Sequence, residues 1–570
     1  MKFAKCSVVG LGFLIAIDAH AADYYVATTG SDSNAGSLAA PFATLQKGAD
    51  VAVAGDTVYI RGGTYAITTP KTSGAGVTFS KSGTSDSNRI RYWAYSGEVP
   101  IFDFTNMVLS TTGYTHGFVV TGSWLHFRGL ELRNVPENTR SNNAIAANGG
   151  GNCIFEQLNL HHNSGNGIFI GQGQGGDLIL NCDAHDNYDA TSAQGDGQNA
   201  DGFGVHYQTG GASTIVRGCR AWWNSDDGYD LINQEVPVII ENSWAMGNGY
   251  INSGTARPAA GNGNGFKAGS SKTGVRHVIQ NSLAWKNVSS GFYANHSSGG
   301  NDWFNNTSYN NGTQYNMLAS DPNDSSITII LSGTLVHKMR NNIGFPNKNS
   351  NMGGVDTAFN TWDLGITPAA GDFASVTDTG AMGPRQPDGS LPNLNFMKLP
   401  LGSKMIDKGT NVGLPFAGVA PDLGAFEYGV VSTGGTGGAG AAGSAGATAA
   451  GGASGSTGLG GASAAGGASA AGGATAAGGV TAGSGAPGAS GALNAAGAFA
   501  SGGNLGTAGS SAASGGTGDA VDAAPSDAQS SSGCGCSVVG KSSSLPSSAG
   551  RFLPLLAALA LLRQRRRARC

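Results

Sequence analysis

The sequence predicts an all-β fold, a parallel β-helix in which each coil of the chain contributes short strands to long sheets. Stretches of alternating apolar and polar residues recur through the middle of the chain, as expected for half-buried strands. An asparagine follows each stretch, and the base period between these asparagines is 24 residues. A leucine-rich repeat has a similar period but a leucine-dense signature that is missing here, and a propeller blade is about twice as long. One β-helix coil per repeat therefore fits the sequence best.

The recurring asparagines predict a hydrogen-bonded ladder along one turn of the coil. Their spacings are 24, 37, 24, 39 and 24 residues. Successive coils of a β-helix lie about 4.8 Å apart, so each side-chain amide is expected to bond to the coils above and below it. The predicted ladder consists of Asn163, Asn187, Asn224, Asn248, Asn287 and Asn311.

The two long spacings indicate insertions at the same place in the coil, directly after the ladder asparagine. One insertion falls within Tyr188–Ala200 and the other within Gly249–Asn262. Insertions in a solenoid form loops on one face, which is often the binding face. We therefore expect the functional site beside these two segments.

The ends of the solenoid need caps, because a terminal coil has no neighbour on one side. Tyr24–Val26 is expected to form a strand, and the segment Pro41–Ala54 has helical spacing that predicts a short N-terminal capping helix. Asn341–Tyr428 is less regular and is expected to pack along the coils or cap their far end. The apolar side of the predicted helix consists of Phe42, Leu45, Ala49 and Val53.

Composition divides the chain into four segments. Residues 1–21 predict a signal peptide, with Lys2 and Lys5 before an apolar run and with Ala19–Ala21 as the cleavage pattern. Residues 22–428 mix aromatic, β-branched and polar residues and are expected to form the β-helix domain. Residues 429–532 are almost entirely Gly, Ala, Ser and Thr, which can bury no core and therefore predict a disordered linker. Residues 533–570 form a distinct tail.

The tail carries three features in order, namely Gly533–Cys536, the apolar run Phe552–Leu562 and an arginine cluster that starts at Arg563. The apolar run is about half as long as a comfortable bilayer span. This layout resembles the C-terminal sorting tails that retain exported proteins at the bacterial cell surface. We expect a secreted protein, attached to the membrane or cell surface through a tail that is processed near the Gly-Cys pair, and a plain membrane anchor is the alternative.

Charge and cysteine usage exclude some classes of protein. The net charge of -4 argues against a nucleic-acid partner, because such domains usually carry a basic patch. Export permits disulfides, but Cys153, Cys182 and Cys219 are an odd number in the folded segment and have no zinc-site spacing. We expect them to behave as small buried apolar residues, and their pairing stays open.

A capped β-helix can be a monomer, and we expect a monomer here.

Aligning the coils on a recurrent glycine gathers acidic residues at one place. The alignment puts Asp201 beside Asp227, with Asp226 in the same turn, and Asp230 beside Lys267. If the aromatic residue at the third position points into the core, strand alternation turns Asp230 and Lys267 outward to solvent. Strict alternation would turn Asp201 and Asp227 inward, unless the glycine that follows each of them introduces a kink.

Four carboxylates this close repel one another strongly without a cation. Asp201, Asp226, Asp227 and Asp230 offer hard oxygen ligands, of which Ca²⁺ takes six to eight, and the Ser225 carbonyl is a further candidate. Mg²⁺ suits the set less well because it demands stricter geometry. The alternative is that the aspartates are ordinary turn residues. We expect them to bind Ca²⁺.

Lys267 is the candidate base. A free lysine has a pKa of about 10.4, and a neighbouring cation or partial burial would lower the pKa into a useful range. In a uronic acid the C5 proton is next to a carboxylate, and metal coordination of that carboxylate acidifies it. A neutral lysine can then remove the proton and break the C4–O bond by β-elimination. Without a metal, a salt bridge between Lys267 and Asp230 is the better interpretation.

These motifs resemble polysaccharide lyase family 9, the pectate lyase L type, over most of the segment from Asp23 to Tyr428. The specific motifs are Asn199–Phe203, Ser225–Asp230 and Asn264–Lys267. The resemblance implies a right-handed β-helix with one catalytic Ca²⁺, held by Asp201, Asp226, Asp227, Asp230 and the Ser225 carbonyl, and with Lys267 as the base. It also implies an acidic plant cell-wall polysaccharide as the partner, either polygalacturonate (pectate) or rhamnogalacturonan, and it leaves both open. Weaker motifs shared with many β-helix proteins are Gly30–Asp32, Pro41–Leu45 and Gly55–Tyr59.

Two other classes of function were compatible with parts of the sequence. A β-helix glycoside hydrolase would use two of the carboxylates but leaves Lys267 without a role. A non-catalytic, surface-anchored glycan-binding protein fits the linker and tail, but it does not require an aspartate cluster beside a lysine. Histidines at scattered turn positions suggest a second metal only weakly, and we expect structural or glycan-contacting roles for His161, His162, His185, His206 and His296.

Overall fold

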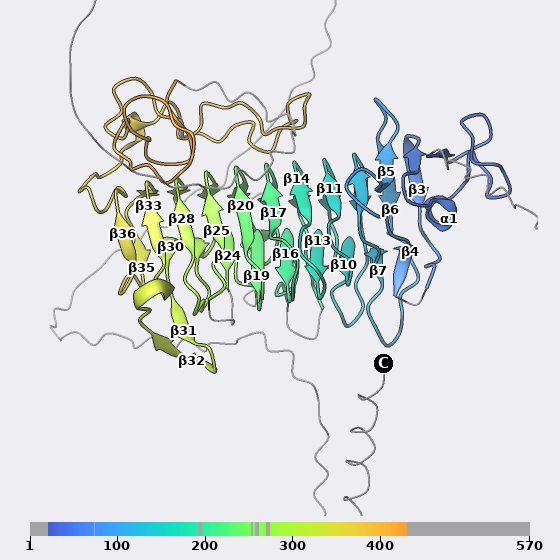
Figure 1. Cartoon of the computed structure of the whole chain (residues 1–570), viewed down its shortest axis with the longest axis horizontal. Helices are drawn as coiled ribbons and strands as arrows, with labels where there is room; N and C mark the ends of the chain where they lie inside the picture. Colours follow the sequence, from blue (N-terminus) through green and yellow to red (C-terminus); the bar gives the residue numbers. More distant parts are fainter. Residues whose placement is uncertain are drawn as a thin grey trace, which may run out of the picture. The chain divides into compact units, whose positions relative to one another are not determined.

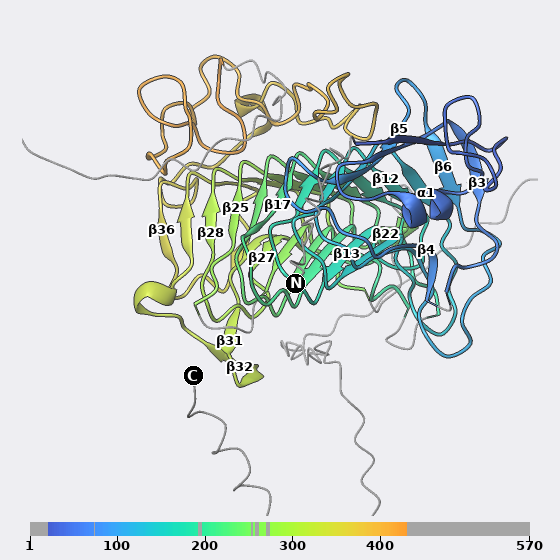
Figure 2. The ribbon, with the colours of Figure 1, turned by 45° about the vertical axis from the view of Figure 1, so that its right-hand side comes forward.

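The chain forms a right-handed parallel β-helix whose coils stack their strands into three long sheets, one of twelve strands and two of ten (Figure 1, Figure 2). The computed structural model describes residues 21–72, 74–191, 196–251, 255–256, 261–269 and 274–429. The expected signal peptide up to residue 20, and the expected linker and sorting tail from residue 430 onward, lie outside the described residues. The predicted fold class is confirmed.

Every strand pair within the three long sheets is parallel, with each coil directly in register with the next. Sheet 1 consists of β1 Asp23–Val26, β2 Thr57–Ile60, β5 Ile90–Ala94, β8 Leu125–Arg128, β11 Ile154–Glu156, β14 Leu178–Leu180, β17 Thr214–Arg217, β20 Val238–Glu241, β25 Val278–Gln280, β28 Asp302–Phe304, β33 Lys338–Arg340 and β36 Asp356–Ala358. Sheet 2 consists of β3 Gly63–Ala66, β6 Pro100–Asp103, β9 Glu131–Arg133, β12 Asn159–His161, β15 Asp183–His185, β18 Arg220–Trp222, β21 Trp244–Met246, β26 Leu283–Trp285, β29 Thr307–Tyr309 and β34 Ile343–Phe345. Sheet 3 consists of β4 Ala75–Phe79, β7 His116–Val120, β10 Ile145–Asn148, β13 Ile168–Gly171, β16 Phe203–His206, β19 Tyr229–Ile232, β24 Phe266–Ala268, β27 Ser290–Tyr293, β30 Thr313–Asn316 and β35 Asn349–Ser350.

The remaining elements lie between or beside the coils. Two antiparallel hairpins pair β22 Tyr250–Ile251 with β23 Thr255–Ala256, and β31 Ala319–Asp321 with β32 Asp324–Ile329. The helices are α1 Leu45–Val51 and the short 3₁₀ turns η1 Gly333–Leu335 and η2 Ala370–Asp372.

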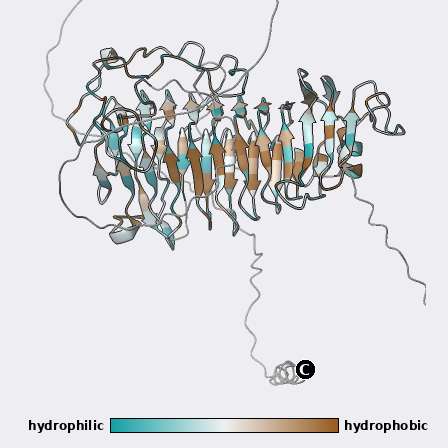
Figure 3. Cartoon of the chain, turned by 45° about the horizontal axis from the view of Figure 1, so that its top comes forward, coloured by the Kyte–Doolittle hydropathy of each residue, from teal (hydrophilic) through white to brown (hydrophobic). Residues whose placement is uncertain are grey.

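The interior of the solenoid is filled by side chains of matching type from successive coils, and the strands of the middle coils are hydrophobic (Figure 3). On sheet 3 the ring of Tyr229 stacks on Phe203 at 5.1 Å and on Phe266 at 4.5 Å between ring centroids. The stack continues through Phe292 to Tyr315, and all five rings are buried. The third-position aromatic residues therefore point into the core, which is the condition on which the predicted orientation of Asp230 and Lys267 depended.

The asparagine ladder is confirmed along the turn between sheets 2 and 3. Asn187 donates from Nδ2 to Asn224 Oδ1 at 2.9 Å, and Asn224 donates in turn to Asn248 Oδ1 at 3.0 Å. The same bond joins Asn163 to Asn187 at 3.0 Å and continues through Asn287 to Asn311. Because these amides are buried, each satisfied rung avoids the cost of an unpaired polar group and ties consecutive coils together.

The cysteines take part in a second ladder, along the turn between sheets 1 and 2. The Leu158 amide donates to Cys182 Sγ, and the Cys182 amide donates to Cys219 Sγ, each at 3.4 Å. Farther along, serine and asparagine side chains accept the corresponding bonds, beginning with Ser243. Cys153, Cys182 and Cys219 are buried and free, so the prediction of small buried side chains holds, but two of them are also weak hydrogen-bond acceptors.

The capping helix forms but is shorter than predicted. The Thr44 hydroxyl accepts a hydrogen bond from the Lys47 amide and so caps the N-terminus of α1, which ends at Val51. Leu45 and Ala49 are buried against the first coils as predicted, whereas Val53 is 55% exposed because it lies beyond the helix end. Within the described part of the chain, no helix is long and apolar enough to cross a bilayer.

The two insertions meet on the same face of the solenoid, as their shared place in the coil predicts. The second insertion carries the hairpin of β22 and β23. A side chain at Gly261 would collide with the carbonyl oxygens of Ser225 and Gly197, so Gly261 allows the second insertion to approach the first directly beside Ser225. The loops therefore flank the turn that carries the predicted aspartates.

The C-terminal part of the domain packs along sheet 2, which confirms one of the two predicted arrangements. Trp285 on β26 contacts Phe396, and a second apolar cluster joins this segment to β21, β26 and β34. Arg385 donates to the Asp183 carboxylate on β15, and Asp183 also pairs with Arg220 at 2.6 Å. An apolar cluster and a buried charge network thus anchor the segment to the coils.

Candidate active site

The predicted site lies where the turn between sheets 2 and 3 enters the strands of sheet 3. Asp230 on β19 is in register with Lys267 on β24 on one side and with Gly204 on β16 on the other. The flanking residues Tyr229 and Phe266 are paired in the same way and point into the core. The alignment on the recurrent glycine therefore predicted the register correctly.

Asp201 and Asp227 are rungs of a third ladder, at the start of sheet 3. The Asp227 amide donates to Asp201 Oδ1 at 3.0 Å, and the Asn264 amide donates to Asp227 Oδ1 at 2.7 Å. The Asp201 amide donates in turn to Asn166 Oδ1 at 3.1 Å. Both aspartates precede their strands by two residues, so strand alternation does not apply to them. The ladder bonds orient both carboxylates toward the site, so the kink that was expected at the following glycines is not required.

Asp226 and Asp230 complete the acidic cluster. Asp226 Oδ1 accepts a hydrogen bond from the Asn262 amide at 2.7 Å, so the second insertion holds this carboxylate in place. Carboxylate oxygens of Asp201, Asp226 and Asp227 lie within 4.8 Å of one another, and Asp201 is equally close to Asp230. The structure brings together all four aspartates that were predicted as ligands.

Lys267 lies against this cluster, with Nζ 2.9 Å from Asp227 Oδ2 and 3.3 Å from Asp230 Oδ2. Lys267 and Asp230 point away from the core, as predicted, but they do not face open solvent, since Lys267 is only 8% exposed and Asp230 only 3%. That part of the prediction was wrong, because strand alternation says nothing about the residues that cover the outer face. The salt bridge considered between Lys267 and Asp230 is present, and Lys267 pairs with Asp227 as well.

The electrostatics of the cluster are dominated by burial and by like charges. Burial, and then the neighbouring carboxylates, hold the pKa of Asp201 and Asp226 well above the usual value. Burial also raises the pKa of Asp227. At Asp230 burial is the largest single influence, but the interactions with Lys267 and His206 together outweigh it and lower the pKa. Burial alone would lower the pKa of Lys267, but the aspartates raise it well above the usual value. One lysine does not balance four carboxylates, so the site favours a further cation.

The donor atoms fit a hard divalent cation. Asp230 Oδ1 is buried without a hydrogen-bond partner among the described residues, and Asp227 Oδ2 has the Lys267 ion pair but no hydrogen bond there. Buried carboxylate oxygens without hydrogen bonds destabilise the folded protein unless another partner, such as a bound cation, satisfies them. Ser225 directly precedes Asp226 in this turn, and its carbonyl oxygen packs closely against Gly261. Oxygen donors of this kind suit Ca²⁺.

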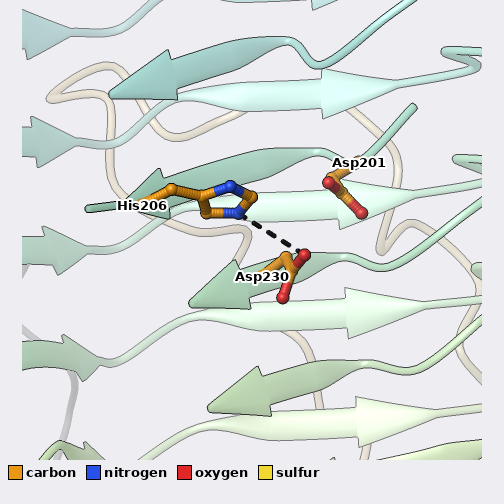
Figure 4. Close-up of side chains that lie close together, drawn as sticks. All are labelled: Asp201, His206 and Asp230. Atoms are coloured by element: carbon orange, nitrogen blue, oxygen red, sulfur yellow. Dashed lines mark ion pairs between the residues drawn. The ribbon is translucent and has the colours of Figure 1, made fainter. Parts of the chain in front are cut away.

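His206 was not predicted as a member of the site, yet it lies beside Asp230 (Figure 4). His206 Nε2 is 3.4 Å from Asp230 Oδ2. Gly204, two residues earlier on the same face of β16, carries no side chain, and a Cβ there would contact His206 Nε2 at 3.4 Å. Gly204 is the feature of the sequence that could have indicated this role for His206. Because the glycine has no side chain, the space beside Asp230 is available to the imidazole.

Basic and aromatic residues that resemble substrate contacts have other partners. Arg220 is buried and pairs with Asp183, so its role is to anchor the C-terminal segment. Trp222 stacks on His185 at 4.1 Å between ring centroids on the outer face of sheet 2. Lys286 pairs with Asp378 at 2.9 Å. Tyr293, in contrast, is the register partner of Lys267 on the next coil and lies beside the site.

The model of the family described as "Pel9A-like, right handed beta helix region" matches residues 24–351. Pectate lyase L of Dickeya dadantii is 37% identical over 407 residues, which cover 71% of this chain and 90% of that protein. Pectate lyase L of Paenibacillus polymyxa is 31% identical over 408 residues, covering 69% of this chain and 85% of that protein.

Two solved structures share the fold and a third of the sequence. The crystal structure of pectate lyase Pel9A superposes with a TM-score of 0.61 at 35% identity, covering 72% of this chain and 96% of that chain. A rhamnogalacturonan lyase superposes with a TM-score of 0.60 at 33% identity, covering 66% and 96%. The hydrolase and the non-catalytic interpretations are therefore set aside. The chain belongs to the Pel9A-like family of right-handed β-helix proteins and is a polysaccharide lyase.

Proposed function

We propose that this enzyme cleaves pectate, or a related pectic uronan, by β-elimination in a calcium-dependent reaction with Lys267 as the base. The observation that carries the proposal is the position of Lys267, buried against Asp227 and Asp230 in a cluster of four carboxylates. The relatives called pectate lyase L support the choice of substrate.

Asp201, Asp226, Asp227 and Asp230, with the Ser225 carbonyl, are the residues that would hold Ca²⁺. When bound, Ca²⁺ supplies positive charge that stabilises the enolate-like charge on the substrate carboxylate and so acidifies the C5 proton. The ladder bonds from Asn264 to Asp227 and from Asp227 to Asp201 hold these carboxylates in fixed orientations. The residues of the chain therefore provide a preorganised set of donors at the turn.

Lys267 is suited to take the proton because burial favours its neutral amine. The aspartates raise the pKa of Lys267. When a cation balances their charge, burial becomes the main influence and lowers that pKa. The amine then accepts the C5 proton, the C–H electron pair forms the C4–C5 double bond, and the C4–O bond breaks. The leaving oxygen takes its proton from water, and no nucleophile is required.

The test is the ultraviolet absorbance of the unsaturated product. The full chain is incubated with polygalacturonate or with rhamnogalacturonan, each with Ca²⁺ and with EDTA. We expect absorbance to rise on polygalacturonate with Ca²⁺ and to stop with EDTA. A rise that is unaffected by EDTA would rule out the calcium dependence, and no rise on either polymer would rule out the proposed substrates.

Rhamnogalacturonan is the second candidate substrate, because a rhamnogalacturonan lyase is nearly as similar in structure as pectate lyase Pel9A. Its backbone also contains a uronic acid, so the same β-elimination applies. The ratio of initial rates on the two polymers decides between them.

We also propose that the protein is exported, acts as a monomer and is attached to the bacterial cell surface through the tail of residues 533–570. The support is the order of tail features, from Gly533–Cys536 through an apolar run to arginines. Intact-mass analysis of the protein purified from its own cells should find residues 1–21 and the terminal arginines removed. Finding the arginines retained would rule out processing of the tail.

A further inference from the structure

His206 gives the acidic cluster a donor of a different chemical type. It is buried, with 8% of its surface exposed, and its Nε2 points toward the carboxylates of Asp201 and Asp230 (Figure 4). Nε2 is buried without a hydrogen bond to the described part of the chain, and it lies 3.4 Å from Asp230 Oδ2. A buried ring nitrogen without such a bond, beside two carboxylates, can act as a ligand.

The donors of the cluster form two overlapping sets. Asp201, Asp226 and Asp227 offer oxygens only, within 4.8 Å of one another, whereas Asp201, His206 and Asp230 offer two oxygens and one nitrogen within the same limit. Ca²⁺ takes oxygen ligands and gains little from imidazole. Divalent ions such as Zn²⁺ and Co²⁺ accept imidazole together with carboxylate.

We propose that Asp201, His206 and Asp230 form a binding site for a transition-metal dication such as Zn²⁺ or Co²⁺. Asp201 and Asp230 also belong to the set proposed for Ca²⁺, so the two kinds of ion exclude one another. Binding of the transition metal follows from the three side chains alone, whereas its competition with Ca²⁺ rests on the proposed function.

Local geometry supports a ligand role for His206 beyond simple packing. Its ring lies edge-on to Phe169, at 5.0 Å between centroids and an interplanar angle of 78°, which limits the orientation of the imidazole. A Cβ on Gly204 would collide with the Asn166 amide nitrogen and would lie in van der Waals contact, at 3.4 Å, with both Phe169 and His206 Nε2, so the glycine leaves this space beside the imidazole open. The imidazole is therefore held with Nε2 toward the carboxylates before any ion binds.

The test is calorimetric titration of the metal-stripped full chain with ZnCl₂, alone and with saturating CaCl₂, in the wild type and in His206→Gln. Glutamine places a polar amide close to the position of Nε2 but cannot bind a metal through an imidazole lone pair. His162→Asn is the matched control, because it removes an exposed histidine on another turn of the solenoid, at a positive φ that asparagine tolerates.

We expect one Zn²⁺ site of the wild type to weaken at least about tenfold in His206→Gln and to be unchanged in His162→Asn, since loss of a ligand typically costs that much or more. The Ca²⁺ affinity of His206→Gln should stay within about threefold of the wild type. The Co²⁺-loaded wild type should show a visible absorption spectrum that His206→Gln changes.

Zn²⁺ binding and a Co²⁺ spectrum that are identical in wild type and His206→Gln would overturn the inference. If saturating Ca²⁺ does not weaken the binding of Zn²⁺, the claim that the two ions share ligands is wrong. If the wild type binds Zn²⁺ through His206 but binds no Ca²⁺, the proposed cofactor fails while this inference stands. Unchanged thermal unfolding of His206→Gln confirms that the comparison is made between folded proteins.

Discussion

Asp201 and Asp227 occupy ladder positions that neighbouring coils fill with Asn166 and Asn264. At each rung the Oδ1 atom accepts the main-chain amide of the next coil, so aspartate and asparagine are equivalent there for folding. They differ in the second atom, which is a charged oxygen in aspartate and an amide nitrogen in asparagine. An aspartate therefore brings a carboxylate oxygen to this position and leaves the scaffold bond intact.

Sequence reasoning placed Lys267 and the four aspartates in one site, because the glycine alignment fixes which residues stack. It did not find His206, which depends on the gap at Gly204 and on the orientation of a side chain. It also did not predict that Lys267 is buried, because burial of the outer face depends on what covers it. Stacking follows from periodicity, but these features depend on packing in three dimensions.

Asp201→Asn should separate folding from function. The ladder bond to the Asp227 amide is retained, and one of several mutually repelling buried charges is removed, so thermal stability should be unchanged or higher. Activity should fall more than about 100-fold through loss of a metal ligand. Asn143→Ser, another rung of this ladder outside the site, should retain activity. Full activity of Asp201→Asn at low Ca²⁺ would show that this carboxylate is not a ligand.

Asp177 predicts a pH dependence of stability that is independent of the active site. Burial raises the pKa of Asp177 to about 7 in the folded state, despite hydrogen bonds from the Cys153 amide and Gln208. Between about pH 4 and 7 the unfolded chain releases this proton and the folded chain retains it, so stability falls as pH rises through that range.

Asp177→Asn removes that ionisation and should make the protein more stable than the wild type at pH 8, by up to about 4 kcal/mol, with little difference at pH 4. Urea unfolding at several pH values measures this difference. Curves for the two proteins that stay parallel from pH 4 to 8 would show that Asp177 does not titrate in this range.

At the scale of elements, the ladder of asparagines links each coil to the next. The spacing of 24 residues, with two insertions, was sufficient to predict every rung from Asn163 to Asn311, because a fixed period specifies which residues stack. The helix boundary was less predictable. Val53 continues the helical spacing of α1, but the helix ends at Val51, and the chain then turns toward β2.

Asn287→Ala should destabilise the protein by about 2–4 kcal/mol, because it leaves buried partners on both neighbouring coils without their hydrogen bonds. Chemical unfolding measures the loss. Asn323→Ala, at an exposed position in the turn between β31 and β32, should change stability by less than about 0.5 kcal/mol. Equal effects of the two substitutions would show that the ladder does not contribute specifically.

At the scale of the whole domain, the C-terminal segment is held to sheet 2 by contacts that no local pattern predicts. Arg385 and Asp183 are 202 positions apart in the sequence, and only the folded chain brings them together. Asp183 accepts from both Arg220 and Arg385, whose charges outweigh the effect of burial and lower its pKa. The sequence predicted that this segment packs against the coils, but not which residues hold it.

Asp183→Ala should cost about 3–5 kcal/mol, because it leaves the buried guanidinium groups of Arg220 and Arg385 without a counter-charge. Limited proteolysis should then cleave the segment after Ala358 sooner than in the wild type. Asp50→Ala, which breaks the exposed ion pair with Lys71, is the control and should cost less than about 1 kcal/mol. Equal proteolysis of both variants would argue against the role of Asp183.

The most direct test of the proposed mechanism is the rate of calcium-dependent formation of unsaturated product by Lys267→Ala and Lys286→Ala at saturating Ca²⁺. Lys286, directly after β26, is half-exposed and pairs with Asp378. The Lys286→Ala variant therefore controls for the loss of a positive charge. We expect Lys267→Ala to lose more than about 1,000-fold in kcat while still binding Ca²⁺, and Lys286→Ala to stay within about threefold of the wild type. A Lys267→Ala enzyme that retains its kcat would contradict the assignment of Lys267 as the base.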